Sequence, residues 1–138
     1  GGKYYMYGRC WRKHITDCYD DVIKIYRDYL CGKVWLEKNA DKGMVARDLK
    51  AFGLRTRTYH ESMNKHIKIT TYLKRVWRDV YFVEGTDEEY IQMILDYNEN
   101  AEHDDCPDSA SSILREVYFK KDREVYVDPL IEELKGAY

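Results

Sequence analysis

One stretch organises the chain: Glu102-His103-Asp104-Asp105-Cys106-Pro107-Asp108-Ser109-Ala110, in which acidic residues and a histidine crowd together. Pro107 fits the first turn of a helix, because the N–H that proline lacks has no helical partner there. The following residues place apolar side chains at the spacing of one buried helix face: Ala110, Ile113, Leu114, Val117 and Tyr118. The pattern predicts a helix that begins near Cys106 or Pro107.

Two carboxylates in this stretch are separated by one helical turn. If the first turn extends back to Asp105, the side chains of Asp105 and Asp108 point the same way, with His103 just outside. Such a pair suits a divalent cation. Acidic residues also gather at helix N-termini because they cap N–H groups and complement the helix dipole, and the sequence leaves both interpretations open. Asp108 lies nearly opposite the apolar face, so we expect it to face solvent or an open cleft.

The composition is that of a folded domain. With 138 residues, of which 44% are apolar, the chain is long enough for one domain with a hydrophobic core. The sequence contains no signal peptide and no apolar run near the roughly 20 residues of a membrane span, so we expect no membrane partner. The cysteines lack the short paired spacing of a structural zinc site and favour a reduced, cytosolic setting, with two disulfides as the alternative interpretation; they are Cys10, Cys18, Cys31 and Cys106.

The formal net charge of −2 conceals a segregation of charge along the chain. Residues 47–78 contain nine lysines and arginines and two acids, whereas residues 84–108 contain ten acids and no lysine or arginine. A basic block followed by an acidic block is typical of a metal site beside a phosphate-binding surface. Two solvated faces of opposite sign would give the same pattern.

A short buried strand is predicted at Val34-Trp35-Leu36, and Glu37 follows it directly. Ligands of open α/β sheets bind beyond the carboxyl ends of the strands, so Glu37 is a candidate site residue. An ordinary exposed glutamate at a strand end is the alternative interpretation.

The helix predicted at residues 64–78 is amphipathic. Its expected buried stripe is Ile69, Tyr72, Leu73, Val76 and Trp77. Lys65, Lys68 and Arg75 are expected to stay exposed outside this stripe. Because such a basic face can follow a phosphate backbone, these three residues are candidate nucleic-acid-binding residues.

The rest of the chain alternates strand and helix patterns. Further strands are predicted within residues 3–14, turned at Gly8, and at 54–58, 80–83 and 123–127; further helices are predicted at 17–30, 41–52, 86–97 and 129–134. The expected helix starts and stops are Thr16 or Asp17, Gly32, Asn39 or Asp41, Gly53, Asn64, and a Thr86 and Glu89 capping box. Val45, Leu49 and Phe52 are expected to face the core. The alternation predicts an α/β fold whose sheet is at least partly parallel.

Three segments occur in a recognisable order and spacing: Val34-Trp35-Leu36-Glu37-Lys38-Asn39, Asn64-Lys65-His66-Ile67-Lys68-Ile69 and His103-Asp104-Asp105-Cys106-Pro107-Asp108-Ser109-Ala110. With them, residues 4–118 resemble the C-terminal nuclease domain of the large terminase subunit of tailed bacteriophages. In that family a strand ends in an acid followed by Asn, a basic segment opens the next long helix, and a His-Asp-Asp-x-x-Asp-Ala-like motif begins the last one. Only the final motif is specific, and the other two gain weight from their order.

The resemblance implies a ribonuclease H-like mixed sheet flanked by helices, and a metal-dependent endonuclease that cleaves concatemeric viral DNA during genome packaging. Glu37 and Asp108 would correspond to metal-binding acids, and Asp105 to an auxiliary acid one turn earlier. Which of Asp104, Asp105 and Asp108 bind metal directly stays open. Two Mg²⁺ or Mn²⁺ ions about 4 Å apart would serve such a reaction, one activating water and the other stabilising the leaving oxygen.

The partners implied by the resemblance are double-stranded DNA, a packaging ATPase domain, and a portal or small subunit. The implied location is the cytoplasm of an infected or lysogenic bacterial host cell. The alternative function is a non-catalytic module of a packaging motor that docks nucleic acid or protein.

The sequence departs from the family pattern at one point. The family places its first catalytic aspartate on a strand upstream of the equivalent of Tyr4, and this sequence contains neither that strand nor the phosphate-loop motif of the ATPase. We therefore expect a single partial nuclease domain with its first strand missing, weak or inactive alone. Gly1-Gly2 are expected to be left from cloning, and residues 119–138 to form a C-terminal extension.

Overall fold

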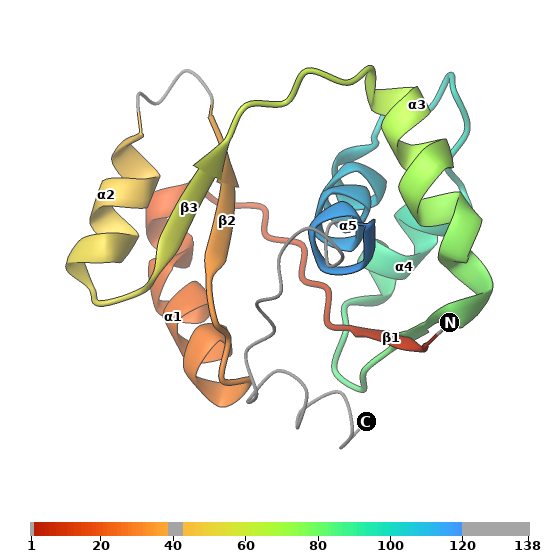
Figure 1. Ribbon diagram of the computed structural model, residues 1–138. Coiled ribbons are helices and arrows are strands. Elements are labelled where there is room, and N and C mark those ends of the chain that lie inside the picture. Colours follow the sequence, from red (N-terminus) through yellow and green to blue (C-terminus); the bar gives the residue numbers. More distant parts are fainter. Residues whose placement is uncertain (1, 39–42, 120–138) are drawn as a thin grey trace. The chain divides into compact units, whose positions relative to one another are not determined.

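Two separate pairs of parallel strands form the β-structure of the described chain (Figure 1). The computed structural model describes residues 2–38 and 43–119, which group into two compact units. Unit 1 consists of residues 2–10 and 63–119, and unit 2 of residues 11–38 and 43–62. The predicted mixture of helices and parallel strands is confirmed, with one small parallel sheet described in each unit. The ribonuclease H-like arrangement stays a prediction.

Unit 2 contains a strand, helix and strand in succession, preceded by one helix. Its elements are the 3₁₀ turn η1 (Ile15–Cys18), α1 (Tyr19–Asp28), β2 (Val34–Glu37), α2 (Met44–Ala51) and β3 (Thr56–Tyr59). β2 and β3 run parallel, with Val34 opposite Thr56 and Glu37 opposite Tyr59. The strand predicted before Glu37 is confirmed, although its apolar residues are half-buried rather than buried.

The core of unit 2 is small and forms around α2. Val45 and Leu49 are buried four residues apart on one face of this helix, and Leu54 is buried beside them. Phe52 was expected to face the core, but its side chain is 54% exposed because the helix ends at Ala51. Gly53 follows with a φ of 92°, a left-handed conformation that glycine adopts without steric cost.

The ends of α1 differ from the prediction. The helical segment begins with η1, and its cap is His14, whose Nδ1 accepts a hydrogen bond from Thr16 N at 3.2 Å, instead of Thr16 or Asp17. After the helix it is Leu30, and not Gly32, that takes a positive φ of 51°. The expected α2 caps at positions 39 and 41, and the elements predicted at 123–134, lie outside the described residues.

Unit 1 combines the other strand pair with three helical segments. Its elements are β1 (Tyr4–Met6), α3 (Lys65–Lys68), the π-helical η2 (Ile69–Lys74), the 3₁₀ turn η3 (Trp77–Asp79), β4 (Val80–Phe82), α4 (Glu88–Leu95), α5 (Asp105–Leu114) and the π-helical η4 (Arg115–Phe119). β1 lies parallel to β4 (Figure 1). The start of α3 is confirmed at Asn64, whose Oδ1 accepts a hydrogen bond from Ile67 N at 3.1 Å.

The core of unit 1 lies among η2, α4 and α5. Ile69, Leu73, Ile94 and Ala110 are fully buried in it. The buried stripe predicted for residues 64–78 is confirmed at Ile69, Leu73 and Val76, whereas Tyr72 and Trp77 are half-buried. These contacts fix α5 against the segment that follows α3.

Two helix starts in unit 1 lie one or two residues from their predicted positions. Asp87 is the N-cap residue of α4, so the predicted capping box is wrong; Thr86 Oγ1 instead donates to Val83 O at 2.7 Å. α5 begins at Asp105, which makes Pro107 its third residue.

The buried face predicted for α5 is confirmed at Ala110 and Leu114, which are buried, but the prediction is wrong at Ile113. Ile113 was expected to be buried, but it is 39% exposed, and Ser111 and Ser112 are buried instead.

Within the described ranges, no helix is both long and apolar enough to cross a membrane.

Candidate functional site

The acidic stretch that organises the sequence forms the start of α5. Asp105 is the first helical residue, and Asp104 O accepts a hydrogen bond from Asp108 N at 2.9 Å. The side chain of Asp104 makes no capping hydrogen bond to the helix and instead accepts one from Lys65 Nζ at 3.1 Å. The first turn therefore extends back to Asp105, which is the condition under which the sequence places Asp105 and Asp108 on the same turn, and side-chain capping does not explain Asp104.

Lys68 of α3 reaches the same turn from inside unit 1. Its side chain is 1% exposed, and its Nζ lies 2.6 Å from Asp108 Oδ1 in an ion pair. The same Nζ donates a hydrogen bond to Ser112 Oγ at 2.8 Å, one turn further along α5. Asp108 therefore faces a buried ammonium group, and the expectation that it faces solvent or an open cleft is wrong.

The ion pair offsets the cost of removing two charges from water. A buried ammonium or carboxylate costs several kcal/mol unless it is paired and hydrogen-bonded. Asp108 Oδ1 is buried and accepts no hydrogen bond from the described residues, so the positive charge of Lys68 compensates it. Loss of either partner would leave the other charge uncompensated.

The exposure predicted for Lys68 is wrong, and its proposed contact with a phosphate backbone is withdrawn with it. The prediction assumed 3.6 residues per turn throughout the helix. From Ile69 onward the segment is π-helical, with hydrogen bonds between residues five apart. Lys68 is the last residue before this π-helical segment, and its side chain is buried against Asp108 and Ser112 of α5.

Lys65 responds electrostatically to the whole acidic turn. The hydrogen bond to Asp104 raises the pKa of Lys65, and the charges of Asp104, Asp108 and Asp105 raise it further, while burial lowers it. Lys65 is exposed as predicted, with 47% of its side chain accessible. The start of α5 therefore places three aspartates close together, with the exposed Lys65 and the buried Lys68 beside them.

A histidine and a tyrosine also contact each other beside this turn. His66 Nδ1 lies 2.8 Å from the hydroxyl of Tyr97, and the ring centroids are 5.8 Å apart. Burial raises the pKa of Tyr97, and the nearby charges of Asp104, Glu99 and Asp108 raise it further. The charge of Lys65 acts in the opposite direction and lowers the pKa of Tyr97.

Glu37 lies at the end of β2 in unit 2 and is exposed. Asp105 and Asp108 belong to unit 1. The structure therefore brings together two of the three predicted metal-binding residues, Asp105 and Asp108. Glu37 belongs to the other unit.

The carboxylates at the start of α5 are the hard donors that Mg²⁺ and Mn²⁺ prefer. Among residues 2–38 and 43–119, however, no group of three or more His, Cys, Asp or Glu side chains is arranged to hold a metal ion. Asp104 and Asp108 are paired with Lys65 and Lys68. The described donor set is incomplete for a closed cation site.

Arg75, the third residue predicted to contact nucleic acid, is exposed as predicted, together with Lys74 and Arg78.

Ser112 was not identified from the sequence, although its position four residues after Asp108 indicates a shared helix face.

Arg115 was also missed by the sequence-based prediction. It is 8% exposed, donates a hydrogen bond to Met63 Sδ at 3.6 Å, and lies with its Cζ 5.9 Å from the centre of the Tyr72 ring. No sequence signal separates such a buried arginine from an exposed one.

A scan against protein-family models finds no match, and searches of curated proteins and of solved structures find no match either. The resemblance to terminase nuclease domains therefore stays a prediction.

Proposed function

We propose that the chain is part of a metal-dependent DNA endonuclease, with Asp105 and Asp108 as its acidic residues in unit 1. The observation that carries the proposal is the pairing of two segments that are far apart in the sequence. Both belong to the family-like pattern, and they meet through Lys65 and Asp104 at 3.1 Å and through Lys68 and Asp108 at 2.6 Å. A hydrolase of this class needs acidic oxygens held in fixed positions, and these contacts supply that fixation.

Lys68 acts in this proposal as a positioning residue. Its ammonium group places positive charge within a group of aspartates, which lowers the electrostatic cost of holding them ionised side by side. It also fixes the rotamer of Asp108 from within the core, because Lys68 Nζ is hydrogen-bonded to Ser112 Oγ. Asp105 is exposed beside this fixed pair and can receive a ligand.

Mg²⁺ or Mn²⁺ would be the cofactor and would supply Lewis-acid chemistry at a phosphodiester. Asp105 and Asp108 would contribute oxygen ligands. The resemblance assigns Glu37 the same role, and that assignment stays a prediction. Double-stranded DNA would be the substrate, contacted through Lys65 and Arg75.

The test is the nicking of supercoiled plasmid DNA in the presence of Mn²⁺. It compares this chain and a longer chain, extended upstream through the strand that the resemblance implies, with variants Glu37→Gln, Asp105→Asn and Asp108→Asn. Asp96→Asn is the matched control, because Asp96 is an exposed aspartate of unit 1 whose side chain accepts a hydrogen bond from Gln92 at 2.8 Å.

The proposal predicts that each site variant loses at least tenfold in nicking rate, whereas Asp96→Asn retains the rate of the unsubstituted chain. Circular dichroism of each variant checks that the fold is retained. Equal rates in all variants, or no nicking by either chain length, would overturn the proposal.

A module that docks nucleic acid or protein without catalysis is the second candidate. It is favoured by one observation, namely that the charge of Asp108 is already compensated by Lys68. For such a module, Asp105→Asn and Asp108→Asn would leave DNA affinity unchanged, and the chain would bind no divalent cation at the start of α5.

A further inference from the structure

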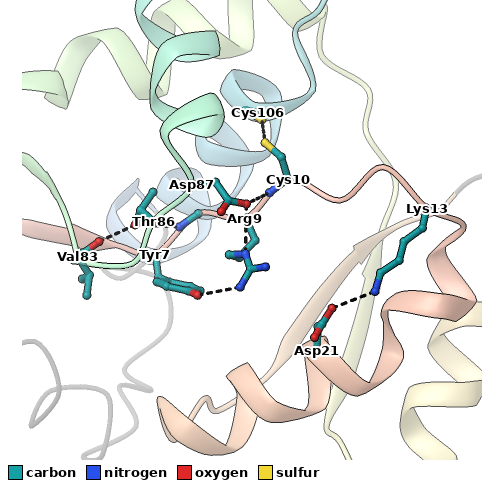
Figure 2. A network of polar contacts seen from close by, with 10 residues as sticks. Tyr7, Arg9, Cys10, Lys13, Asp21, Val83, Thr86, Asp87 and Cys106 are labelled. Atoms are coloured by element: carbon teal, nitrogen blue, oxygen red, sulfur yellow. Dashed lines mark hydrogen bonds and ion pairs between the residues drawn. The ribbon is translucent and has the colours of Figure 1, made fainter.

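Two cysteines of unit 1 lie in contact although 96 residues separate them in the sequence. Cys10 Sγ and Cys106 Sγ are 3.2 Å apart (Figure 2). A disulfide requires a sulfur–sulfur distance of about 2.05 Å, so the two sulfur atoms need to approach by only about 1 Å. Both residues belong to unit 1, so their contact is internal to one compact unit.

Backbone contacts hold both cysteines in place. Cys10 N donates a hydrogen bond to Asp87 Oδ2 at 2.7 Å, and the same oxygen lies 3.2 Å from Arg9 Nε (Figure 2). Cys106 is the second residue of α5, is 6% exposed, and its N donates to Met93 Sδ at 3.4 Å. The pair is therefore positioned by α4 and α5 as well as by its own segments.

We propose that Cys10 and Cys106 are a modification site at which an intramolecular disulfide forms by exchange with a low-molecular-weight disulfide such as oxidised glutathione. Cys10 is half-buried and can be reached from solvent, whereas Cys106 is buried. Cys10 is therefore the attacking residue, and Cys106 is the resolving residue. This site does not depend on the proposed nuclease function.

The exchange proceeds in two balanced steps. The thiolate of Cys10 attacks one sulfur of the small disulfide, forms a mixed disulfide and releases one small thiolate. The thiolate of Cys106 then attacks Cys10 Sγ, forms the intramolecular bond and releases the second small thiolate. The protein loses two protons and two electrons, and the small disulfide is reduced to two thiols.

The other two cysteines lack this arrangement. Cys18 is 1% exposed, and its Sγ donates to His14 O at 3.5 Å. Cys31 Sγ donates to Ile25 O at 3.9 Å, and burial raises the pKa of the Cys31 thiol, which disfavours the reactive thiolate. Both belong to unit 2. The exchange is therefore expected to select Cys10 and Cys106.

Peptide mapping under non-reducing conditions tests the proposal. The fully reduced, folded chain is incubated with oxidised glutathione, quenched with acid and digested. The expected product is one cross-linked peptide pair that contains Cys10 and Cys106, with Cys18 and Cys31 recovered as thiols. Absence of this cross-link, or a predominant cross-link between any other two cysteines, would overturn the proposal.

Single substitutions test the order of the two steps. Cys106→Ser removes the resolving thiol and should trap one glutathione on Cys10, whereas Cys10→Ser should leave Cys106 unmodified over the same time. Cys31→Ser is the matched control and should retain the cross-link. Glutathione trapped on Cys106 as fast as on Cys10 would overturn the assigned roles.

Discussion

At the scale of single residues, Lys68 links the fold of unit 1 to its candidate site. Its ammonium group is 1% exposed and pairs with Asp108, which retains 19% exposure. Such pairs contribute little relative to a well-packed apolar pair, but removal of one partner is costly because the other charge stays buried. Substitution of Lys68 should therefore destabilise the fold more than substitution of an ordinary surface lysine.

Replacement of Lys68 by Met tests this pairing. Lys68→Met should lower the free energy of unfolding by about 3 kcal/mol, because Asp108 is left partly buried without its cation. The double variant Lys68→Met, Asp108→Asn should recover part of this loss. Urea unfolding measures both, with Lys74→Met as the control at an exposed lysine of the next turn. A loss below about 0.5 kcal/mol, as at ordinary surface positions, would contradict the pairing.

Tyr90 predicts a pH dependence of stability. Burial raises its pKa to about 12 from the ordinary value of 10, against a smaller lowering by a hydrogen bond with Ser109. The folded state therefore holds the phenolic proton more tightly than the unfolded state does. This contribution is complete below pH 10 and is lost as the pH rises through 12.

The variant Tyr90→Phe isolates this effect, because all other alkaline titrations are common to both proteins. Between pH 9 and pH 12 the unsubstituted chain should lose about 2 kcal/mol more unfolding free energy than Tyr90→Phe, at about 1.4 kcal/mol per unit of pKa difference. Denaturant unfolding at several pH values in a reducing buffer measures the difference. Parallel profiles would show that Tyr90 titrates at the same pH in both states.

At the scale of elements, the segment after β1 packs closely on α4. A Cβ atom at Gly8 would lie 2.3 Å from Cδ1 of the Tyr90 ring, which no side-chain contact tolerates. Gly8→Ala should therefore lower the free energy of unfolding by about 2 kcal/mol, the usual cost of overpacking. Thermal unfolding compares it with Gly2→Ala, where a Cβ atom meets nothing within 4 Å. Equal stability of the two variants would contradict the contact.

Most element positions could be predicted from the sequence because they depend on local periodicity. The apolar spacing identified the buried faces at Ile69 and Leu73 and at Val45 and Leu49. Asn64 was recognised as a helix start because its side-chain oxygen can cap the first N–H groups, as it does for Ile67 N. These signals need only the chain within one or two turns. The predicted positions of helix ends were less accurate. For example, Leu30 takes a positive φ after α1, and its residue type does not indicate this conformation.

The candidate site was predictable only in part. The spacing of Asp105 and Asp108 placed both on one turn, which the structure confirms. The burial of Lys68 was not predictable, because it depends on contact with Asp108, in a helix about forty residues later. The contact between Cys10 and Cys106 was missed for the same reason, since no local pattern encodes a tertiary contact.

At the scale of the whole molecule, segregation of charge predicts how the chain would bind DNA. Arg75 is exposed, in contrast to Lys68, and phosphate contacts release condensed counterions. Arg75→Ala should weaken DNA affinity equally across sequences and reduce the salt dependence by about one unit of slope. Fluorescence anisotropy over a range of salt concentrations measures both. Lys24→Ala, at a lysine of unit 2 that pairs with Asp28, is the control.

Unchanged affinity and slope in Arg75→Ala would show that Arg75 does not contact DNA. Of the two residues proposed to contact DNA, only Lys65 would then remain.

The most direct test of the proposed site is the binding of Mn²⁺ to the folded chain, followed by the loss of the electron paramagnetic resonance signal of free Mn²⁺. Asp105 and Asp108 share one turn and are predicted to provide oxygen ligands. The unsubstituted chain and Asp96→Asn should bind Mn²⁺ with equal affinity, and the double variant Asp105→Asn, Asp108→Asn should bind it at least tenfold more weakly. Equal affinity in all three proteins, or no binding by any of them, would contradict a metal-dependent site at the start of α5.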